Sequence, residues 1–317
     1  MFKTLMRKHP EQLLSPVLID RKKNQKRSKD RAILFGLLFA FCFVALASAF
    51  VGLSFLMADY LLVDSQLYWL YFTLAGIVTL VLGIFGSIFA TYSMLYQAKD
   101  NELLLSMPLT PSSILLTRMV GVYGMGFLFA ALVWIPAVVV YAIKVHPGFV
   151  PILISALMLF VFSFVILTLS CLLGWVVALI ASRVKNKNVV VTLLTILGVG
   201  GYYYLSFNLQ TLLEGLLQKG DILAASIREN AWPLYEIGLA AQGDIGAFLL
   251  CLAFSLVLGA LTWFVLSKTF FKIVTTKRGG KKTVYKEEKA VKRSADSALL
   301  RKEFRRFTSS PAYMLNC

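Results

Sequence analysis

The stretch QAKDNELLLSMPLTPSSILLTR, residues 97–118, separates two long apolar runs and decides how the chain folds around it. Pro108 and Pro111 end an incoming helix, because proline lacks the amide hydrogen and its ring clashes with the preceding turn. Thr110 then has the position of a helix N-cap, with Pro111 as the first helical residue. The pattern predicts a helix, a tight break and a new helix, and we call residues 97–118 the elbow.

The elbow also carries a run of leucines beside two acidic side chains. Leu103, Leu104 and Leu105 closely follow Asp100 and Glu102. On the cytoplasmic side of a membrane, exposed leucines favour binding to a partner protein. The alternative is a simple turn between two spans, with the leucines packed on their own helical bundle. The sequence leaves both interpretations open.

Composition indicates a membrane protein. Of the 317 residues, 58% are hydrophobic and only 15% are charged, whereas soluble domains carry about 25% charged residues. The net charge is +16, but the basic residues border apolar runs. This placement indicates membrane topology and contact with anionic lipid headgroups, and no nucleic-acid partner. The four cysteines include no CxxC pair, so neither a disulfide framework nor a zinc site is indicated.

Six apolar runs are long enough to cross a bilayer, which takes about 20 residues in a helix. They cover residues 32–57, 67–95, 114–143, 150–182, 189–207 and 246–271. The sequence therefore predicts an all-α polytopic membrane protein with a six-helix transmembrane domain over residues 32–271. Residues 1–31 form a basic segment, either an amphipathic entry helix on the bilayer or a solvated tail. Residues 272–298 are predicted to be a flexible, basic cytoplasmic linker.

The positions of lysine and arginine predict the orientation of the chain. Ten lie before the first span, two in the elbow, three in residues 183–187 and fourteen from Lys268 onward, which makes 29. The alternate links hold only Lys144, Lys219 and Arg228. Both termini and the elbow are therefore predicted to be cytoplasmic.

One long segment, residues 208–244, falls on the predicted outer side. Leucines at helical spacing predict a first short helix that ends at Lys219 and Gly220, and a second short helix is predicted around residues 232–241. Both either lie flat at the outer interface or re-enter it shallowly, and so cap the bundle. The segment is interpreted as an outer gate or substrate exit, or alternatively as a surface lid with no special role.

Several kinds of functional group are missing from the sequence. No charged residue lies well inside the six predicted spans, which argues against an ion-coupled transporter. Residues 279–283 lack the earlier glycine of a phosphate-binding loop, since position 275 is Thr275. The two histidines, His9 and His146, fall on opposite sides of the predicted membrane. We therefore expect no catalytic, cofactor-binding or metal-binding residues, and no enzyme activity, in this chain.

Small and hydroxylated residues recur within the spans. Pairs at four-residue spacing predict close helix packing; they are Ala45/Ala49, Ser48/Gly52, Gly86/Ala90 and Gly174/Ala178. Ser163, Thr168 and Ser170 either line a path or bond to their own helix, and we favour the second interpretation.

Two stretches resemble a known family. Residues 99–108, KDNELLLSMP, followed by TPSSI at residues 110–114, resemble the cytoplasmic elbow of ABC-2-type ABC transporter permeases. The six-span layout with both ends inside, and an outer hairpin over residues 208–244, resemble the same family. Residues 299–317 look like the amphipathic cytoplasmic helix that begins a six-span half in these permeases.

The resemblance implies a bundle like that of type V exporters and the role of a permease subunit in the bacterial plasma membrane. ATP would be bound by a separate ATP-binding subunit, which docks on the elbow. The docking residues implied are Asp100, Glu102, Leu103, Leu104, Met107, Pro108 and Pro111. The chain looks like the first six-span half of a two-half permease, so a second half is expected as a homo- or heterodimer or as a missing C-terminal half. The alternative is a membrane scaffold that moves no solute, or a membrane-embedded enzyme.

Overall fold

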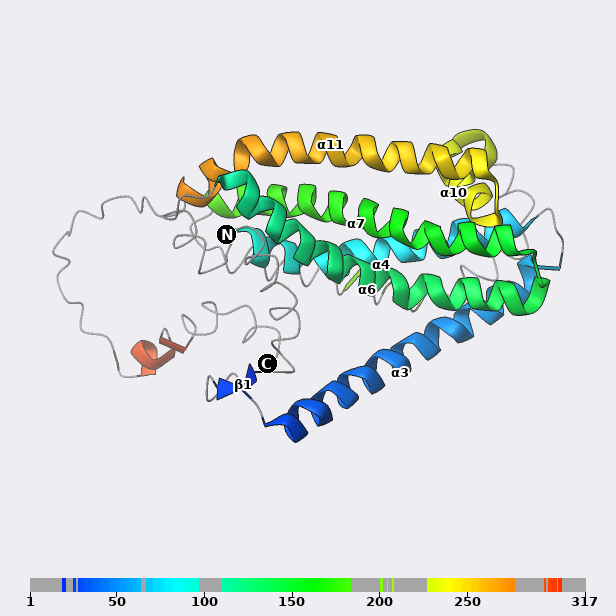
Figure 1. Ribbon diagram of the computed structural model, residues 1–317. Helices are drawn as coiled ribbons and strands as arrows, with labels where there is room; N and C mark the ends of the chain where they lie inside the picture. Colours follow the sequence, from blue (N-terminus) through cyan, green and yellow to red (C-terminus); the bar gives the residue numbers. More distant parts are fainter. Residues whose placement is uncertain are drawn as a thin grey trace.

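The computed structural model describes residues 28–63, 67–96, 110–183 and 227–276, with short pieces within 19–26, 200–207 and 294–303. In chain order the elements are β1 (Ile19–Asp20), β2 (Gln25–Lys26), α3 (Lys29–Leu61), α4 (Tyr68–Tyr96), α6 (Pro111–Val145), α7 (Phe149–Arg183), α10 (Trp232–Gln242) and α11 (Ile245–Thr276). The long helices α4, α6, α7 and α11 run side by side as one bundle, α10 lies at one end of it, and α3 leaves it at an angle (Figure 1).

Five helices in the described part of the chain are long and apolar enough to cross a membrane, and they correspond to five of the six predicted spans. Helices α3, α6 and α11 extend two to five residues beyond at least one end of the predicted apolar run, since a helix continues into the polar boundary of a bilayer, whereas α4 and α7 match their runs to within one residue. The remaining predicted span, the fifth, covers residues 189–207 and lies largely outside the described residues. The helical, polytopic class is confirmed, whereas six spans and a fold of the ABC-2 type are not.

The predicted terminal helices are described only in part. Most of residues 1–31, including residues 1–18, lie outside the described residues, and the described part instead pairs Ile19 with Lys26 and Asp20 with Gln25 in an antiparallel hairpin. Residues 296–300 are helical, while most of the predicted helix over residues 299–317 is outside the described part.

The bundle core is aromatic near α10 and is closed by close helix contacts further along. Phe72, Trp134 and Phe162 are at most 2% exposed. A Cβ at Gly83 would lie 2.2 Å from Ile166 Cδ1, and one at Gly86 would lie 2.8 Å from the Phe129 ring. Glycine at these positions therefore lets α4 approach α6 and α7, as the predicted Gly86/Ala90 pair requires.

Helix α3 packs on the bundle only at its C-terminal end. Its buried residues are Ser54, Met57, Ala58 and Leu61, and its most apolar 18-residue window has none. Nothing lies within 4 Å of a Cβ built at Gly52. Within the described part of the chain, no helix therefore packs closely on α3 at the predicted pairs Ala45/Ala49 and Ser48/Gly52.

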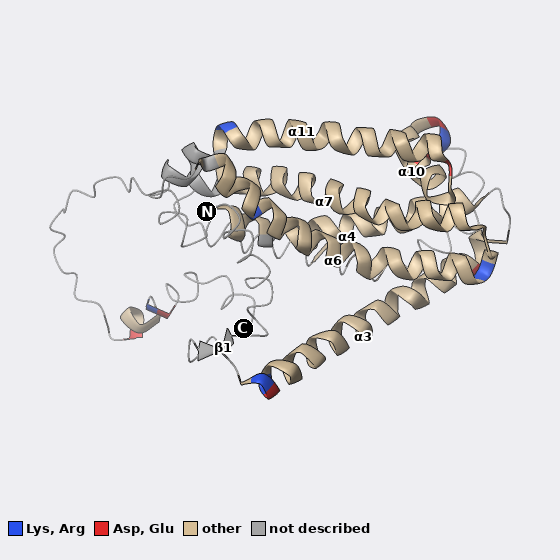
Figure 2. Cartoon of the chain, viewed as in Figure 1, with Lys and Arg blue, Asp and Glu red and all other residues tan. Residues whose placement is uncertain are grey.

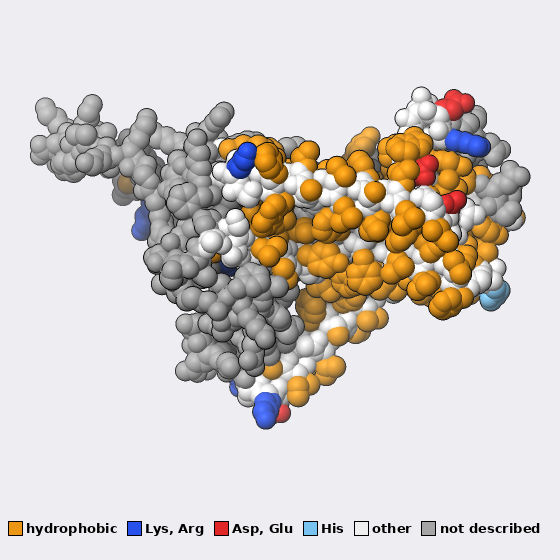
Figure 3. Space-filling view, turned by 45° about the horizontal axis from the view of Figure 1, so that its top comes forward, with side chains coloured by type: hydrophobic (Ala, Val, Ile, Leu, Met, Phe, Trp, Pro, Cys, Tyr) orange, Lys and Arg blue, Asp and Glu red, His pale blue; other side chains and the backbone are white. Residues whose placement is uncertain are grey.

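Charged side chains gather at the two ends of the bundle, and an apolar belt covers its flank (Figures 2 and 3). We call the end that carries α10 the predicted outer end, following the charge distribution, and the opposite end the predicted cytoplasmic end. The belt is what a bilayer requires, because lipid chains offer no partners for charged groups.

Candidate functional site

Most of the predicted docking residues cannot be placed. Asp100, Glu102, Leu103, Leu104, Met107 and Pro108 lie outside the described residues. Pro111 is the first residue of α6, and Thr110 is its N-cap with extended backbone angles of −70° and 137°. The Thr110 hydroxyl lies 2.7 Å from that of Ser113 and makes no cap bond to the backbone. The predicted helix start is confirmed, and docking on the elbow stays a prediction.

The best-defined candidate site is formed by α10, which is embedded in the predicted outer end. The helix has 11 residues, and its buried residues are Gly238, Ala240 and Ala241. It packs against α4, α7 and α11. Of the two predicted placements, lying flat or re-entering, the buried small residues favour a re-entrant one. We call α10 with its following turn, Gly243 and Asp244, the outer plug.

Two hydroxyl groups from different helices hold the outer plug by its backbone. Thr73 Oγ1, on α4, lies 3.0 Å from the Leu234 carbonyl oxygen and 2.9 Å from that of Trp69. Ser155 Oγ, on α7, bonds to the Ala241 carbonyl and to its own Pro151 carbonyl, 2.8 Å away. A hydroxyl has one hydrogen, so each is shared between its helix and the plug.

Close packing against α4 completes the seat of α10. A Cβ at Gly238 would lie 2.3 Å from the Trp69 carbonyl oxygen and 2.3 Å from Thr73 Oγ1, so only glycine fits. The Trp69 and Tyr235 rings meet edge to face with centroids 4.8 Å apart. The Arg228 guanidinium lies 5.6 Å from the Tyr235 centroid, a distance typical of a cation–π contact.

The turn after α10 is fixed by its backbone. Gly243 has φ of +116° and its N–H bonds to the Ala240 carbonyl, while the Asp244 N–H bonds to that of Leu239. These are the two bonds of a Schellman motif, which ends a helix at glycine. Asp244 Oδ1 then accepts the Ala247 N–H at 2.9 Å and so caps α11. The plug is thereby joined directly to the N-terminus of the last spanning helix, α11.

The space below the plug is filled by aromatic rings. Trp134 and Phe162 have ring centroids 4.6 Å apart, and Phe72 lies 4.7 Å from Tyr141. Trp134 Nε1 donates to the Ser155 carbonyl at 2.7 Å, so the residue that holds the plug also joins α6 to α7. Aromatic rings therefore pack closely beneath the plug at the predicted outer end.

The three span hydroxyls considered in the sequence behave differently. Ser163 and Thr168 bond to carbonyls of their own helix, at 2.6 and 2.8 Å, which confirms the interpretation favoured for them. For Ser170 that interpretation is wrong, because its hydroxyl lies 3.0 Å from that of Ser87 on α4. The reason is the narrow spacing between α4 and α7, which brings two small hydroxyl residues into contact.

Charged residues in the described part lie mostly at the helix ends. Lys144 Nζ forms an ion pair with Asp59 Oδ1 at 2.7 Å, between the ends of α6 and α3. Arg118, in α6 near the predicted cytoplasmic end, is 6% exposed and is the one charged residue that is buried among those described. The described residues also hold no group of three or more His, Cys, Asp or Glu suited to a metal ion.

Sequence reasoning missed Thr73 and Ser155, the two residues that hold the plug. Each is a lone hydroxyl in an apolar span, and most such hydroxyls bond to their own helix. The available signal was weak: both lie within two turns of the predicted outer end, close to where the second short helix was predicted.

A family model described as "Membrane protein of 12 TMs" matches residues 30–315. No curated protein and no solved structure matches the chain. The prediction of an ABC-2-type permease is wrong, because the family found is a different one and its twelve spans conflict with a six-span half permease. The resemblance rested on a short elbow and a tail, and leucines followed by proline are common wherever one membrane helix ends and another begins. The chain is an integral membrane protein and belongs to this family of twelve-span membrane proteins.

Proposed function

We propose that this protein is the membrane-spanning part of a transporter, with export as its direction, driven by ATP hydrolysis on a separate subunit. The observation that carries the proposal is the outer plug. An 11-residue helix is about 16 Å long, half of the roughly 30 Å hydrocarbon layer. Such a helix can leave its seat while the spanning helices stay in the bilayer, which is what an outer gate requires.

The strength of the seat suits a gate. Each hydroxyl-to-carbonyl bond contributes about 0.6–1 kcal/mol in a membrane protein, and an edge-to-face ring pair adds about 0.5–1.5 kcal/mol. Two such bonds and the Trp69–Tyr235 pair together contribute about 1.7–3.5 kcal/mol beyond burial. Coupling free energies between distant sites are typically about 1–3 kcal/mol, the same range as these contacts, so a partner's motion can offset them.

We assign the energy source to a separate subunit on the charges of the described residues and on the motifs of the sequence. Ion-coupled transport uses charged side chains within the spans, and of the described residues only Arg118, near one end, is both charged and buried. No phosphate-binding loop occurs in the sequence. In this proposal the chain is not an enzyme, and the elbow, with Asp100 and Glu102, is where the ATP-hydrolysing subunit binds.

Two further features complete the proposal. A second set of spans, from another copy or another chain, lines the pathway together with this one, which agrees with the unpacked N-terminal part of α3. The membrane is the plasma membrane of a bacterium, and anionic lipids contact its basic cytoplasmic face.

Co-purification from native membranes tests the energy source. We expect an ATP-hydrolysing subunit to remain bound to the unmodified chain, and to be lost with Glu102→Arg combined with Leu104→Asp. The matched control, Glu229→Arg with Val63→Asp, makes the same kind of change at exposed positions on the predicted outer side and should keep the subunit bound. Retention of the subunit and of ATP-driven transport in the elbow variant would refute docking on the elbow.

A locked plug distinguishes a transporter from a scaffold. Trp69→Cys with Tyr235→Cys, joined by a short thiol crosslinker, fixes α10 to α4 where the two rings now meet. We expect transport into or out of proteoliposomes to stop when the linker is added and to return when it is cleaved. A scaffold or a membrane-embedded enzyme would keep its activity when locked.

A further inference from the structure

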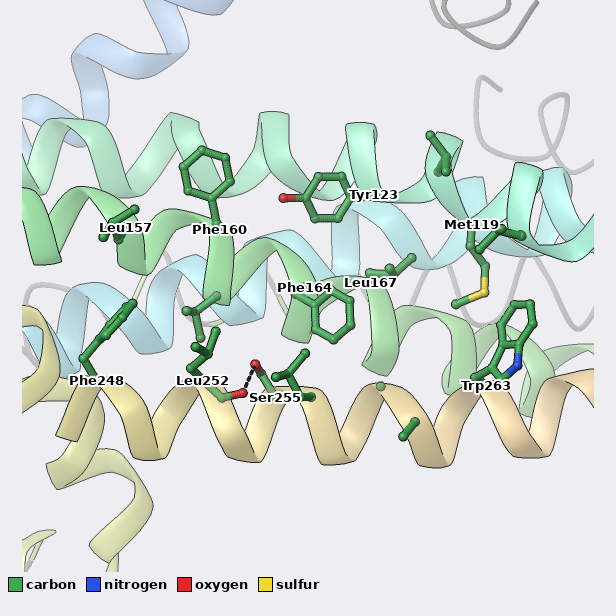
Figure 4. Close-up of a pocket in the computed structure, with 16 residues that line it drawn as sticks. Met119, Tyr123, Leu157, Phe160, Phe164, Leu167, Phe248, Leu252, Ser255 and Trp263 are labelled. Carbon is green, nitrogen blue, oxygen red and sulfur yellow. Dashed lines mark hydrogen bonds between the residues drawn. The ribbon is translucent and has the colours of Figure 1, made fainter. Parts of the chain in front are cut away.

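A groove of about 810 Å³ runs along the flank of the bundle, beside the helix that is joined to the outer plug. Helices α6 and α11 form its walls and α7 its floor (Figure 4). On α11 the groove begins at Phe248 and Leu252. Both residues also pack against the buried cluster to which Ala240 and Ala241 of α10 belong. The groove and the plug therefore adjoin the same part of α11.

Helix α11 is packed more loosely than the other three long helices of the bundle. In its most apolar 18-residue window 22% of the residues are buried, against 44% in α4 and 56% in both α6 and α7. It packs mainly on α7 and α10, and less on α6. Tightly packed helices cannot shift without clashes, so α11 is the helix of the four that is most free to move.

Helix α11 makes a close contact with α7 near its own midpoint. A Cβ at Gly259 would lie 2.5 Å from the Phe164 ring, so the glycine lets the two helices touch there. Small side chains allow helices to approach each other in a membrane, and Ser255, Gly259 and Ala260 all line the groove. A close contact at one point, with a groove beside it, allows α11 to turn about that point.

The groove lies on the α6 side of α11, and the plug lies on its α4 side. Helix α10 packs on α11 and on α4, which make little direct contact with each other, so it lies between them. The turn at Gly243 and the Asp244 cap join it to α11 through the backbone. Side chains hold it on α4, namely the Thr73 hydroxyl and the Trp69 ring. When α11 moves toward the groove, the side-chain contacts with α4 therefore break first.

We propose that the outer half of α11 swings into the groove, over Leu157 and Phe160 of α7, and so draws the outer plug off α4. The contact between Gly259 and Phe164 is the pivot. Leu157 and Phe160 are 39% and 53% exposed, so the swing covers exposed side chains and leaves the core of α4, α6 and α7 intact. The inference rests on the proposed function, because it describes how the proposed gate opens.

A small rotation of α11 is enough to release the plug. The first residue of α11, Ile245, lies about 21 Å from Gly259 at the helical rise of 1.5 Å per residue. A swing of roughly 10° about Gly259 moves that end by about 4 Å, which is within the range of helix shifts in proteins that switch. The Thr73–Leu234 contact, 3.0 Å in the seated plug, then exceeds hydrogen-bonding distance.

A bulky side chain in the outer half of the groove tests the swing in the full chain. The readout is maleimide labelling of Thr73→Cys, at a fully buried position on α4 that α10 covers, with the native cysteines replaced by alanine. Leu256→Trp, on the groove side of α11, overpacks the swung state and should slow labelling about 5- to 150-fold. The matched control is Val257→Trp, at an exposed neighbouring position that does not line the groove, and it should keep the rate.

A second pair of variants gives a readout of opposite sign. Leu256→Ala enlarges the groove and should speed labelling relative to Val257→Ala. Equal rates in either pair, while the crosslinked plug still stops transport, would overturn the swing and leave the gate in place. Slower labelling in Leu256→Trp, together with transport that continues when the plug is crosslinked, would support the swing and contradict the transport function.

Discussion

Adding one methyl group at Gly238 tests whether contact with α4 holds the outer plug. A Cβ there would lie 2.3 Å from the Trp69 carbonyl oxygen, whereas ordinary contacts begin at 3.4 Å. In Gly238→Ala, α10 must therefore move about 1 Å away from α4, because backbone atoms cannot yield. That shift lengthens the Thr73–Leu234 bond from 3.0 Å to about 4 Å, beyond hydrogen-bonding distance.

The expected cost follows from three contributions. Overpacking costs about 1–3 kcal/mol, and the lost hydrogen bond costs about 0.6–1 kcal/mol. Alanine stabilises a helix by about 1 kcal/mol relative to glycine, which offsets part of this cost. The net loss of about 0.6–3 kcal/mol raises the fraction of chains with an unseated plug by roughly 3- to 150-fold.

The native thiol of Cys251 reports whether the plug is seated. Its residue is 8% exposed and belongs to the same buried cluster as Ala240 and Ala241 of α10. In a background where the other cysteines are replaced by alanine, we expect Gly238→Ala to speed maleimide labelling of Cys251. Gly52→Ala, with nothing within 4 Å, is the control. Equal labelling rates in the two variants would refute the steric argument.

Two further substitutions probe single contacts. Ser155→Ala removes the hydroxyl that bonds to the Ala241 carbonyl, so we expect a loss of about 1 kcal/mol in thermal unfolding. Ser48→Ala is the control, because the Ser48 hydroxyl bonds to its own helix at 2.7 Å, and it should change the unfolding midpoint little. Equal unfolding midpoints for Ser155→Ala and Ser48→Ala would contradict the assignment. For Lys144 and Asp59, which are 41% and 55% exposed, a double-mutant cycle should give a coupling below about 1 kcal/mol that weakens in salt. A larger coupling, unaffected by salt, would show a pair shielded from water.

Much of the helical layout could be predicted from the sequence. Apolar runs set five helices to within a few residues, because a bilayer demands about 20 apolar residues per span. The second short outer helix was expected at residues 232–241 and occurs at Trp232–Gln242. Its start at Trp232-Pro233 and its end at Gly243 follow general rules for helix boundaries.

The placement of the helices could not be predicted in the same way. Small residues are needed for close packing, but their positions in the sequence do not indicate which helix packs on them. Gly86 faces Phe129 and Gly174 faces Thr91, while a Cβ at Gly52 would have nothing within 4 Å. The depth of α10 depends on Thr73, whose hydroxyl looks like any other in an apolar span. Inter-helix contacts of this kind join residues far apart in sequence, so no local pattern records them.

The oblique course of α3 has a consequence for the surrounding bilayer. Its 33 residues measure about 50 Å, longer than the hydrocarbon thickness of about 30 Å, and the helix runs oblique to the bundle (Figure 1). It meets the bundle near one surface, at the Lys144–Asp59 pair, and stands apart from it near the other (Figure 1). The described helices therefore occupy unequal areas near the two membrane surfaces, so the lipid or protein that surrounds them must be distributed unequally between the two leaflets.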